Sequence, residues 1–150
     1  MIPESPDPVT DTATPTRRSA LALAGAGLLL PAVAADRPVF QATTGQVAEL
    51  LRAVAGDTAS ISSLMGEGID PHSYKLTRSD TVALMKADAV FHSGLFLEGK
   101  MADMLDKLSA AKPVHAAASA LPADRLIHPD GADAHPDPHI WMDPTLWRLA

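Results

Sequence analysis

Short runs of β-favouring residues alternate with stretches of helical periodicity, and this alternation restricts the possible folds of the chain more than any other feature. The β-favouring runs lie at 39–43, 58–64, 89–91 and 113–116. Stretches with apolar residues at helical spacing separate them, at 44–56, 77–87 and 98–108. Strands joined through helices at this spacing form parallel sheets with right-handed crossovers. We therefore expect an α/β fold, with a parallel sheet of about four strands flanked by helices.

Capping residues mark the ends of the expected helices. Thr44 precedes the first helical stretch as an N-cap, and Gly56 closes it. Thr77 and Asp80 fit the pattern in which a hydroxyl and an acid three residues later satisfy free N–H groups at a helix start. Helical spacing alone explains the apolar stripe of the third stretch, so we expect core packing rather than a cofactor site. That stripe comprises Met101, Met104, Leu105 and Leu108. Residues 118–138, rich in proline and aspartate, are expected to form a polar loop.

The first 35 residues have the features of an export signal. Arg17 and Arg18 directly precede an apolar run. That run is shorter than the ~20 residues that span a bilayer, and it ends in small residues typical of a cleavage site. We expect cleavage near Ala34 or Ala35 and a mature domain at 36–150. The arginine pair resembles a twin-arginine signal, and a general secretory signal with a basic start is the alternative.

Charge and cysteine content argue against several kinds of partner and anchor. The formal net charge is −6, from 12 basic and 18 acidic residues, and the acids are scattered. No basic face is therefore expected for nucleic acid or for anionic lipid. Because there is no cysteine, we expect no thiolate metal ligand, no disulfide and no lipid anchor. We expect a monomer that is free in a periplasmic compartment.

Two histidines follow Asp-Pro pairs, and both are candidate metal ligands. His72 lies in GIDPHSYKLTRSD and His139 lies in DPHIWMDP. Proline restricts the backbone, so less entropy is lost when the next side chain is fixed. Loops at the carboxyl ends of parallel strands are also where such folds bind ligands. Neutral imidazole suits zinc, iron, nickel and copper, and its other nitrogen usually contacts a carboxylate. The nearby carboxylates are Asp70, Asp137 and Asp143. A solvated surface role for either histidine is the alternative.

Three segments resemble the metal-binding receptors of zinc and manganese ABC importers, the family that includes the TroA, PsaA and ZnuA proteins. The segments are GIDPHSYKLTRSD, ADAVFHSGLFLEGKMADML and DPHIWMDPTLW. The resemblance implies that His72 and His139 stand at the positions of two metal ligands. In this family, two further ligands belong to a second α/β lobe beyond a long linking helix. Residues 36–150 would then be the amino-terminal lobe of a two-lobed receptor, and the linking helix would begin at Pro144.

The resemblance also implies a function. The protein would capture a divalent transition metal outside the cytoplasm and deliver it to an ABC permease, without enzymatic activity. Zinc, manganese and iron are all compatible with this function. The resemblance also implies a link to cell adhesion. The residues alone leave two other classes open: a metal-dependent hydrolase whose ion activates water, and an adhesion or interaction module stabilised by a metal. We expect His128 and His135 in a solvated loop, with an ion-collecting loop as the alternative.

Overall fold

The structure is a computed structural model that describes residues 36–129 and 135–150. These residues belong to one compact unit, Asp36–Ala150. The expected export signal at 1–35, with its arginine pair and its cleavage near Ala34 or Ala35, lies outside the described residues. It stays a prediction.

Four short strands form one sheet in which every neighbouring pair is parallel. They are β1 (Val39–Ala42), β2 (Ser60–Ser63), β3 (Ala89–His92) and β4 (Val114–Ala116). Their order is β2-β1-β3-β4, so β1 and β3 are the central strands. The predicted α/β fold with a parallel sheet is confirmed. β2 starts later than the predicted run at 58–64, because a 3-10 turn at Gly56–Thr58 precedes it.

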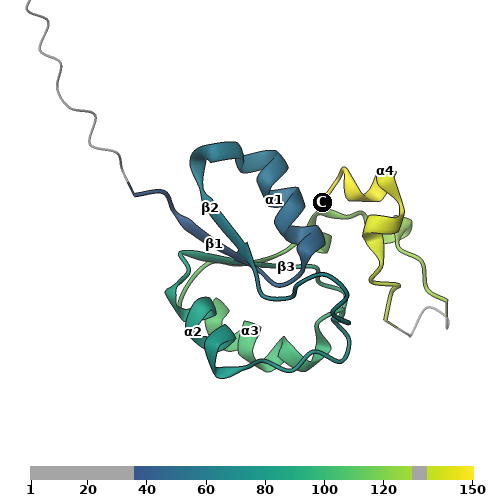
Figure 1. The fold of residues 1–150 in the computed structure, drawn as a ribbon. Coiled ribbons are helices and arrows are strands. Elements are labelled where there is room, and N and C mark those ends of the chain that lie inside the picture. The colour runs from purple at the N-terminus through teal and green to yellow at the C-terminus, as the bar shows by residue number, and fades with distance from the viewer. Residues whose placement is uncertain (1–35, 130–134) are drawn as a thin grey trace, which may run out of the picture. The chain divides into compact units, whose positions relative to one another are not determined.

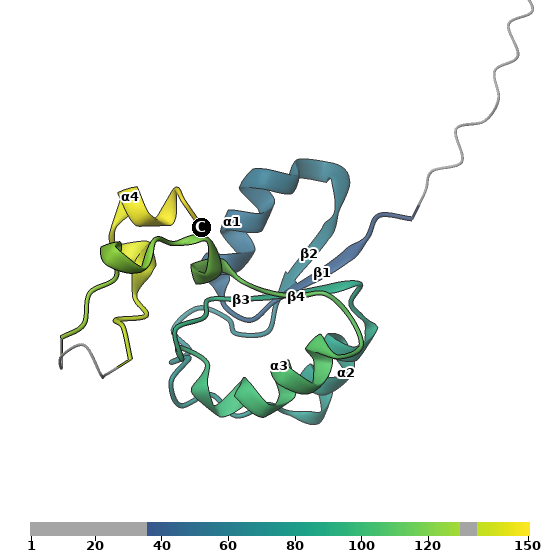
Figure 2. The same cartoon turned by 180° about the vertical axis from the view of Figure 1, so that it is seen from behind.

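Helices cover both faces of the sheet (Figure 1 and Figure 2). α1 (Gly45–Ala55) lies on one face, and α2 (Arg78–Lys86) and α3 (Ala102–Ser109) lie on the other. α4 (Pro144–Trp147) is a helix of four residues that follows the second Asp-Pro-His segment. Among the described residues, no helix combines the length and the apolar character needed to cross a bilayer.

The core is divided between the two faces because side chains alternate along each strand. Val90 belongs to a buried cluster with Leu84 of α2 and Leu105 of α3. Its neighbour Phe91 packs on the other side, against the cluster that contains Val47 of α1. The stripe predicted to be core lies in or against the first cluster, and its members are Met101, Met104, Leu105 and Leu108.

The start of the third helix differs from the prediction. The helix expected from residue 98 begins at Ala102, after a 3-10 turn at Gly99–Met101. Glu98 is only 3% exposed, and its carboxylate accepts hydrogen bonds from Thr43 and Ser93. These buried hydrogen bonds outweigh the preference of glutamate for a helix, which is worth about 0.5 kcal/mol or less.

The segment predicted as a polar loop, 118–138, is packed in its first part. It contains 3-10 turns at Ala117–Ala120 and Ala123–Arg125. Ala118 and Leu121 form a buried cluster with Ile140. Burial of these apolar side chains is favourable, so the part of the segment around Ala118 and Leu121 packs against the domain.

The predicted cap of α2 is present as a reciprocal pair of hydrogen bonds. The Asp80 N–H donates to the Thr77 hydroxyl at 3.2 Å, and the Thr77 N–H donates to the Asp80 carboxylate at 2.7 Å. The Tyr74 hydroxyl donates to the same carboxylate at 2.8 Å. Partial burial alone would raise the pKa of Asp80, but the bonds from Thr77 and Tyr74 hold it below its ordinary value. Through Tyr74, the cap also anchors the loop that carries His72.

Replacing Asp80 by alanine should lower the free energy of unfolding by about 1 kcal/mol at neutral pH, since a cap partner is lost. The pKa of Asp80 is depressed in the folded protein. Its contribution is therefore present above about pH 4 and disappears as the pH falls through the folded-state value. Urea unfolding followed by circular dichroism should show a smaller loss of stability in acid for Asp80→Ala than for wild type. Glu49→Gln, at an exposed position of α1, is the control and should follow wild type. Identical acid sensitivity of wild type and Asp80→Ala would contradict the assignment.

Candidate metal centre

The structure brings the two predicted histidines together at the carboxyl edge of the sheet. His72 lies on the loop between β2 and α2, and His139 lies on the segment between β4 and α4. β2 and β4 are the outer strands, so the two loops approach from opposite sides. The Nε2 atoms are 3.3 Å apart, and the ring centroids are 5.3 Å apart with an interplanar angle of 54°. Both residues are exposed.

This separation suits two ligands of one ion. Nitrogen ligands at ~2.0–2.1 Å from a tetrahedral zinc ion lie ~3.3 Å apart. A metal ion takes the lone pair of a neutral imidazole nitrogen, so both Nε2 atoms must be unprotonated to share an ion. Binding of one ion by both rings therefore requires that the proton of each neutral ring sits on Nδ1.

The Asp-Pro-His motif forms the same local turn at both positions. The backbone N–H of His72 donates to Asp70 Oδ1 at 3.0 Å, and that of His139 donates to Asp137 Oδ1 at 2.9 Å. Aspartate side chains favour such a bond to the backbone two residues later. The intervening proline cannot compete as a donor, because it has no N–H. The sequence pattern indicates proline alone as the residue that orients the histidines, whereas the aspartates also contribute.

Asp137 also orients the His139 ring. Its Oδ1 lies 2.6 Å from His139 Nδ1. With Nδ1–H as the donor, the Nε2 lone pair is left for a metal ion, as is usual for histidine ligands. The His139 backbone N–H and then its ring hold the pKa of Asp137 below its ordinary value. Asp137 is therefore ionised at neutral pH and can stabilise the ring when the ring binds a cation.

The other two predicted partners have structural roles. Asp70 accepts the Ser73 hydroxyl at 2.6 Å in addition to the His72 N–H. Asp143 caps α4, where it accepts the backbone N–H of Thr145 at 2.8 Å. The spacing of these carboxylates in the sequence could not distinguish a ring partner from a cap. Asp70 and Asp137 make the same bond to the backbone, and the position of the His139 ring beside Asp137 is what distinguishes them.

Apolar and aromatic side chains border the histidine pair. Both rings line a cavity of about 330 Å³ together with Leu95, Phe96 and His135. The Phe96 ring lies against the His135 ring, with 4.0 Å between the centroids and an interplanar angle of 33°. Trp141 contacts His139 edge-on, with 5.2 Å between centroids. Leu95 and Phe96 lie on a turn in which both residues have positive φ values. These residue types rarely adopt such values, so the sequence does not predict this turn.

The described residues supply two ligands rather than a whole coordination sphere. Within 36–129 and 135–150, no group of three or more His, Cys, Asp or Glu side chains is arranged to hold a metal ion. Zinc sites use about four protein ligands when structural, and about three with a water when catalytic. Two further histidines contact other groups: His92 Nδ1 lies 3.9 Å from Glu98, and the His115 ring lies against Phe91. The imidazole pair therefore fits a borderline metal such as zinc as part of a larger site.

Known proteins resemble this chain over most of its length. Residues 41–150 match the family described as ZnuA, zinc-uptake complex component A, periplasmic. The manganese-binding lipoprotein MntA of Bacillus subtilis is 43% identical over 130 residues, which are 86% of this chain and 42% of MntA. The zinc-binding protein TroA of Treponema pallidum is 34% identical over 119 residues, which are 79% of this chain and 38% of TroA. The chain thus spans about two fifths of the length of these relatives.

Solved structures share the fold. The periplasmic zinc binding protein TroA from Treponema pallidum matches with a TM-score of 0.71 and 33% identity, over 75% of this chain and 40% of that protein. The Mn-bound periplasmic metal binding protein from Candidatus Liberibacter asiaticus matches with a TM-score of 0.66 and 23% identity, over 75% of this chain and 41% of that protein. The second likeness shows the fold alone. The resemblance seen in the sequence is confirmed, and this chain belongs to the ZnuA family of periplasmic zinc-uptake components.

Proposed function

We propose that this chain supplies two metal ligands, His72 and His139, to an extracytoplasmic receptor that captures a divalent transition metal ion. The observation that carries the proposal is the 3.3 Å separation of their Nε2 atoms. Without a metal, one Nε2–H can donate to the other Nε2 at this distance. The same separation suits two nitrogen ligands of one ion, ~3.3 Å apart around tetrahedral zinc. The bond from His139 Nδ1 to Asp137 leaves Nε2 available for the ion.

Capture and release, rather than catalysis, are the proposed task. The two rings are exposed, so an ion can reach them from solvent and can leave again. Capture requires no general base and no activated water, in contrast to a metal-dependent hydrolase. The remaining ligands would come from outside the described residues, and the receptor would then deliver the ion to an ABC permease.

Zinc and manganese are the proposed cargo. TroA is named as a zinc-binding protein and MntA as a manganese-binding one. Imidazole nitrogens suit zinc, whereas manganese prefers oxygen ligands. The two described ligands by themselves therefore favour zinc. Oxygen ligands from outside the described residues would shift the preference towards manganese.

A location outside the cytoplasm belongs to the same proposal. The matching family and the TroA structure are described as periplasmic, and MntA is named as a lipoprotein. We propose that the predicted leader at 1–35 exports this chain, and that the exported protein works as a monomer with its permease.

His72→Ala and His139→Ala should each weaken zinc binding by the chain at least tenfold, since loss of a mere partner of a ligand already changes affinity about 10–100-fold. Isothermal titration calorimetry measures the affinity. Thermal unfolding should change little because both side chains are exposed on loops. His115→Ala is the matched control, because it removes an exposed imidazole from β4 and leaves the pair intact. Wild-type affinity in either His72→Ala or His139→Ala would refute the ligand assignment.

Asp137→Asn should weaken zinc binding about tenfold. The amide oxygen can still accept the His139 backbone N–H, but without its charge it is a poorer acceptor for Nδ1–H. Asp70→Asn is the matched control: Asp70 occupies the same place in the first motif, where its hydrogen bonds go to a backbone N–H and to Ser73. Calorimetric titration of both variants should show the larger effect at Asp137. Equal effects would contradict a specific role of Asp137 in orienting the ring.

Zinc affinity should decrease as the solution is acidified, because protons compete with the ion for the two Nε2 lone pairs. The pKa of Asp137 is held below its ordinary value, so this carboxylate stays ionised between about pH 5 and 8 and its own protonation does not cause the decrease. Titrations across that range should show a steeper slope of log affinity against pH for wild type than for His72→Ala. A flat profile for wild type is the outcome that this assignment does not allow.

A further inference from the structure

A buried carboxylate joins the carboxyl ends of the two central strands. Glu98 is 3% exposed. Its Oε1 accepts hydrogen bonds from the Thr43 hydroxyl at 2.7 Å and from the Ser93 N–H at 2.8 Å. Thr43 directly follows β1, and Ser93 directly follows β3. Burial alone would raise the pKa of Glu98, but the nearby His92 ring and these two donors hold it below its ordinary value. The carboxylate is therefore charged at neutral pH, with both hydrogen bonds on Oε1 and with Oε2 3.9 Å from His92 Nδ1.

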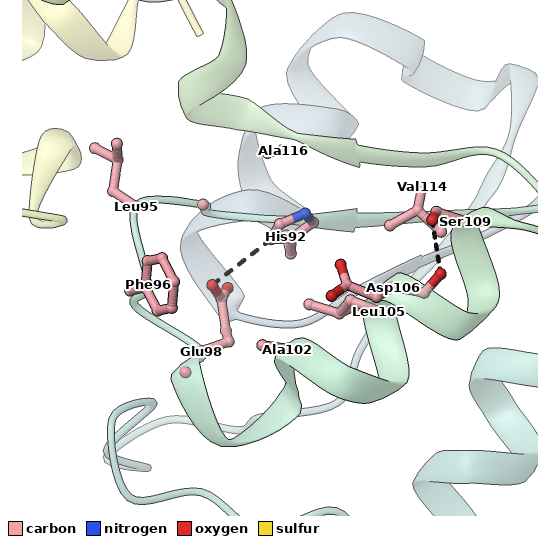
Figure 3. Close-up of a pocket in the computed structure, with 12 residues that line it drawn as sticks. His92, Leu95, Phe96, Glu98, Ala102, Leu105, Asp106, Ser109, Val114 and Ala116 are labelled. Atoms are coloured by element: carbon pink, nitrogen blue, oxygen red, sulfur yellow. Dashed lines mark hydrogen bonds and ion pairs between the residues drawn. The ribbon is translucent and has the colours of Figure 1, made fainter. Parts of the chain in front are cut away.

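Glu98 closes a turn whose backbone is unusual. Gly94, Leu95 and Phe96 have φ values of 88°, 52° and 63°. Leucine and phenylalanine rarely adopt this left-handed region, and they stay there only where surrounding contacts impose it. A side chain at Gly94 would also be crowded, because an added Cβ would lie 3.1 Å from the Cβ of Ala116. Figure 3 shows the His92 ring and the Glu98 carboxylate facing each other, with Leu95 and Phe96 on the turn.

The turn connects Glu98 to the histidine pair. Leu95 packs against the buried cluster of Ala118, Leu121 and Ile140. Ile140 directly follows His139 in the chain. Leu95 and Phe96 also line the cavity that both imidazole rings line. Contacts therefore run from the Glu98 carboxylate, through the turn and the apolar cluster, to the segment that carries His139.

We propose that Glu98 is a positioning residue for the histidine pair. Its hydrogen bonds hold the 94–96 turn in the left-handed conformation, and the turn keeps Leu95 against the cluster that fixes the place of His139. The part of this inference that concerns metal affinity rests on the proposed function. The part that concerns the geometry of the two rings does not, so the two can be tested separately.

Two variants at one position isolate the effect of the hydrogen bonds. Glu98→Ala should remove the nuclear Overhauser effect between ring protons of His72 and His139 in the metal-free 150-residue chain. It should also weaken zinc binding at least about tenfold, the lower end of the range for residues that orient ligands. Glu98→Gln keeps an oxygen that can accept from Thr43 and Ser93, and should restore both properties. Wild-type ring contacts in Glu98→Ala would overturn the inference, as would a failure of Glu98→Gln to restore them.

A third variant tests the same link without touching the buried carboxylate. Leu95→Ala leaves the bonds of Glu98 in place but removes the contact with the cluster that contains Ile140. It should lose the ring contact as Glu98→Ala does, and it keeps the inference testable if Glu98→Ala does not fold. Leu108→Ala truncates a buried leucine of α3 in the cluster that contains Val90, which is separate from the cluster that contains Ile140. This control should be less stable yet retain the ring contact. An equal loss of the ring contact in Leu108→Ala would mean general destabilisation and would overturn the inference.

The measurements also separate this inference from the proposed function. If the wild-type rings are in contact and this contact depends on Glu98, but the chain does not bind zinc, the positioning role stands and the metal-binding proposal fails. If zinc binding requires His72 and His139 but is unchanged in both Glu98→Ala and Leu95→Ala, the proposed function stands and the positioning role is overturned.

Discussion

Parallel pairing of all four strands is the constraint on which the histidine site depends. Because each strand points in the same direction, the loops that follow the strands leave from one edge of the sheet. β2 and β4 are the outer strands, and their loops bring His72 and His139 together although 67 positions separate them in sequence. The central strands end between these loops, where Glu98 ties Thr43 to Ser93. Sheet topology thus sets where the rings can meet, and local hydrogen bonds set how they face each other.

Aspartate carboxylates provide most of that local control, each in a different way. Asp70 and Asp137 make the same bond to the backbone of the histidine two residues later, which gives both histidines the same turn. Asp137 makes one further bond, to the His139 ring. Asp80 fixes the start of α2 and, through Tyr74, the end of the loop that carries His72. The depressed pKa values of these carboxylates have a common cause, which is the number of hydrogen-bond donors directed at each.

Much of the fold could be predicted because its signals are local. β-favouring runs and the capping residues Thr44 and Thr77 place strands and helices near their observed positions. Glu98 was placed wrongly in a helix, because its partners Thr43 and Ser93 become neighbours only when β1 and β3 pair. The two histidines could be named from their motif, but their distance could not, since it depends on the order of the strands. The left-handed turn at Leu95 and Phe96 runs against the preferences of those residues, so only tertiary contacts explain it.

X-ray absorption at the zinc edge of the loaded chain tests the central claim most directly, because it counts the imidazoles on each ion. We expect a single zinc ion per chain, with two imidazole nitrogens at ~2.0–2.1 Å and oxygen ligands completing the shell. Zinc ions that each carry only one imidazole, with His72 and His139 occupied by different ions, would contradict this expectation.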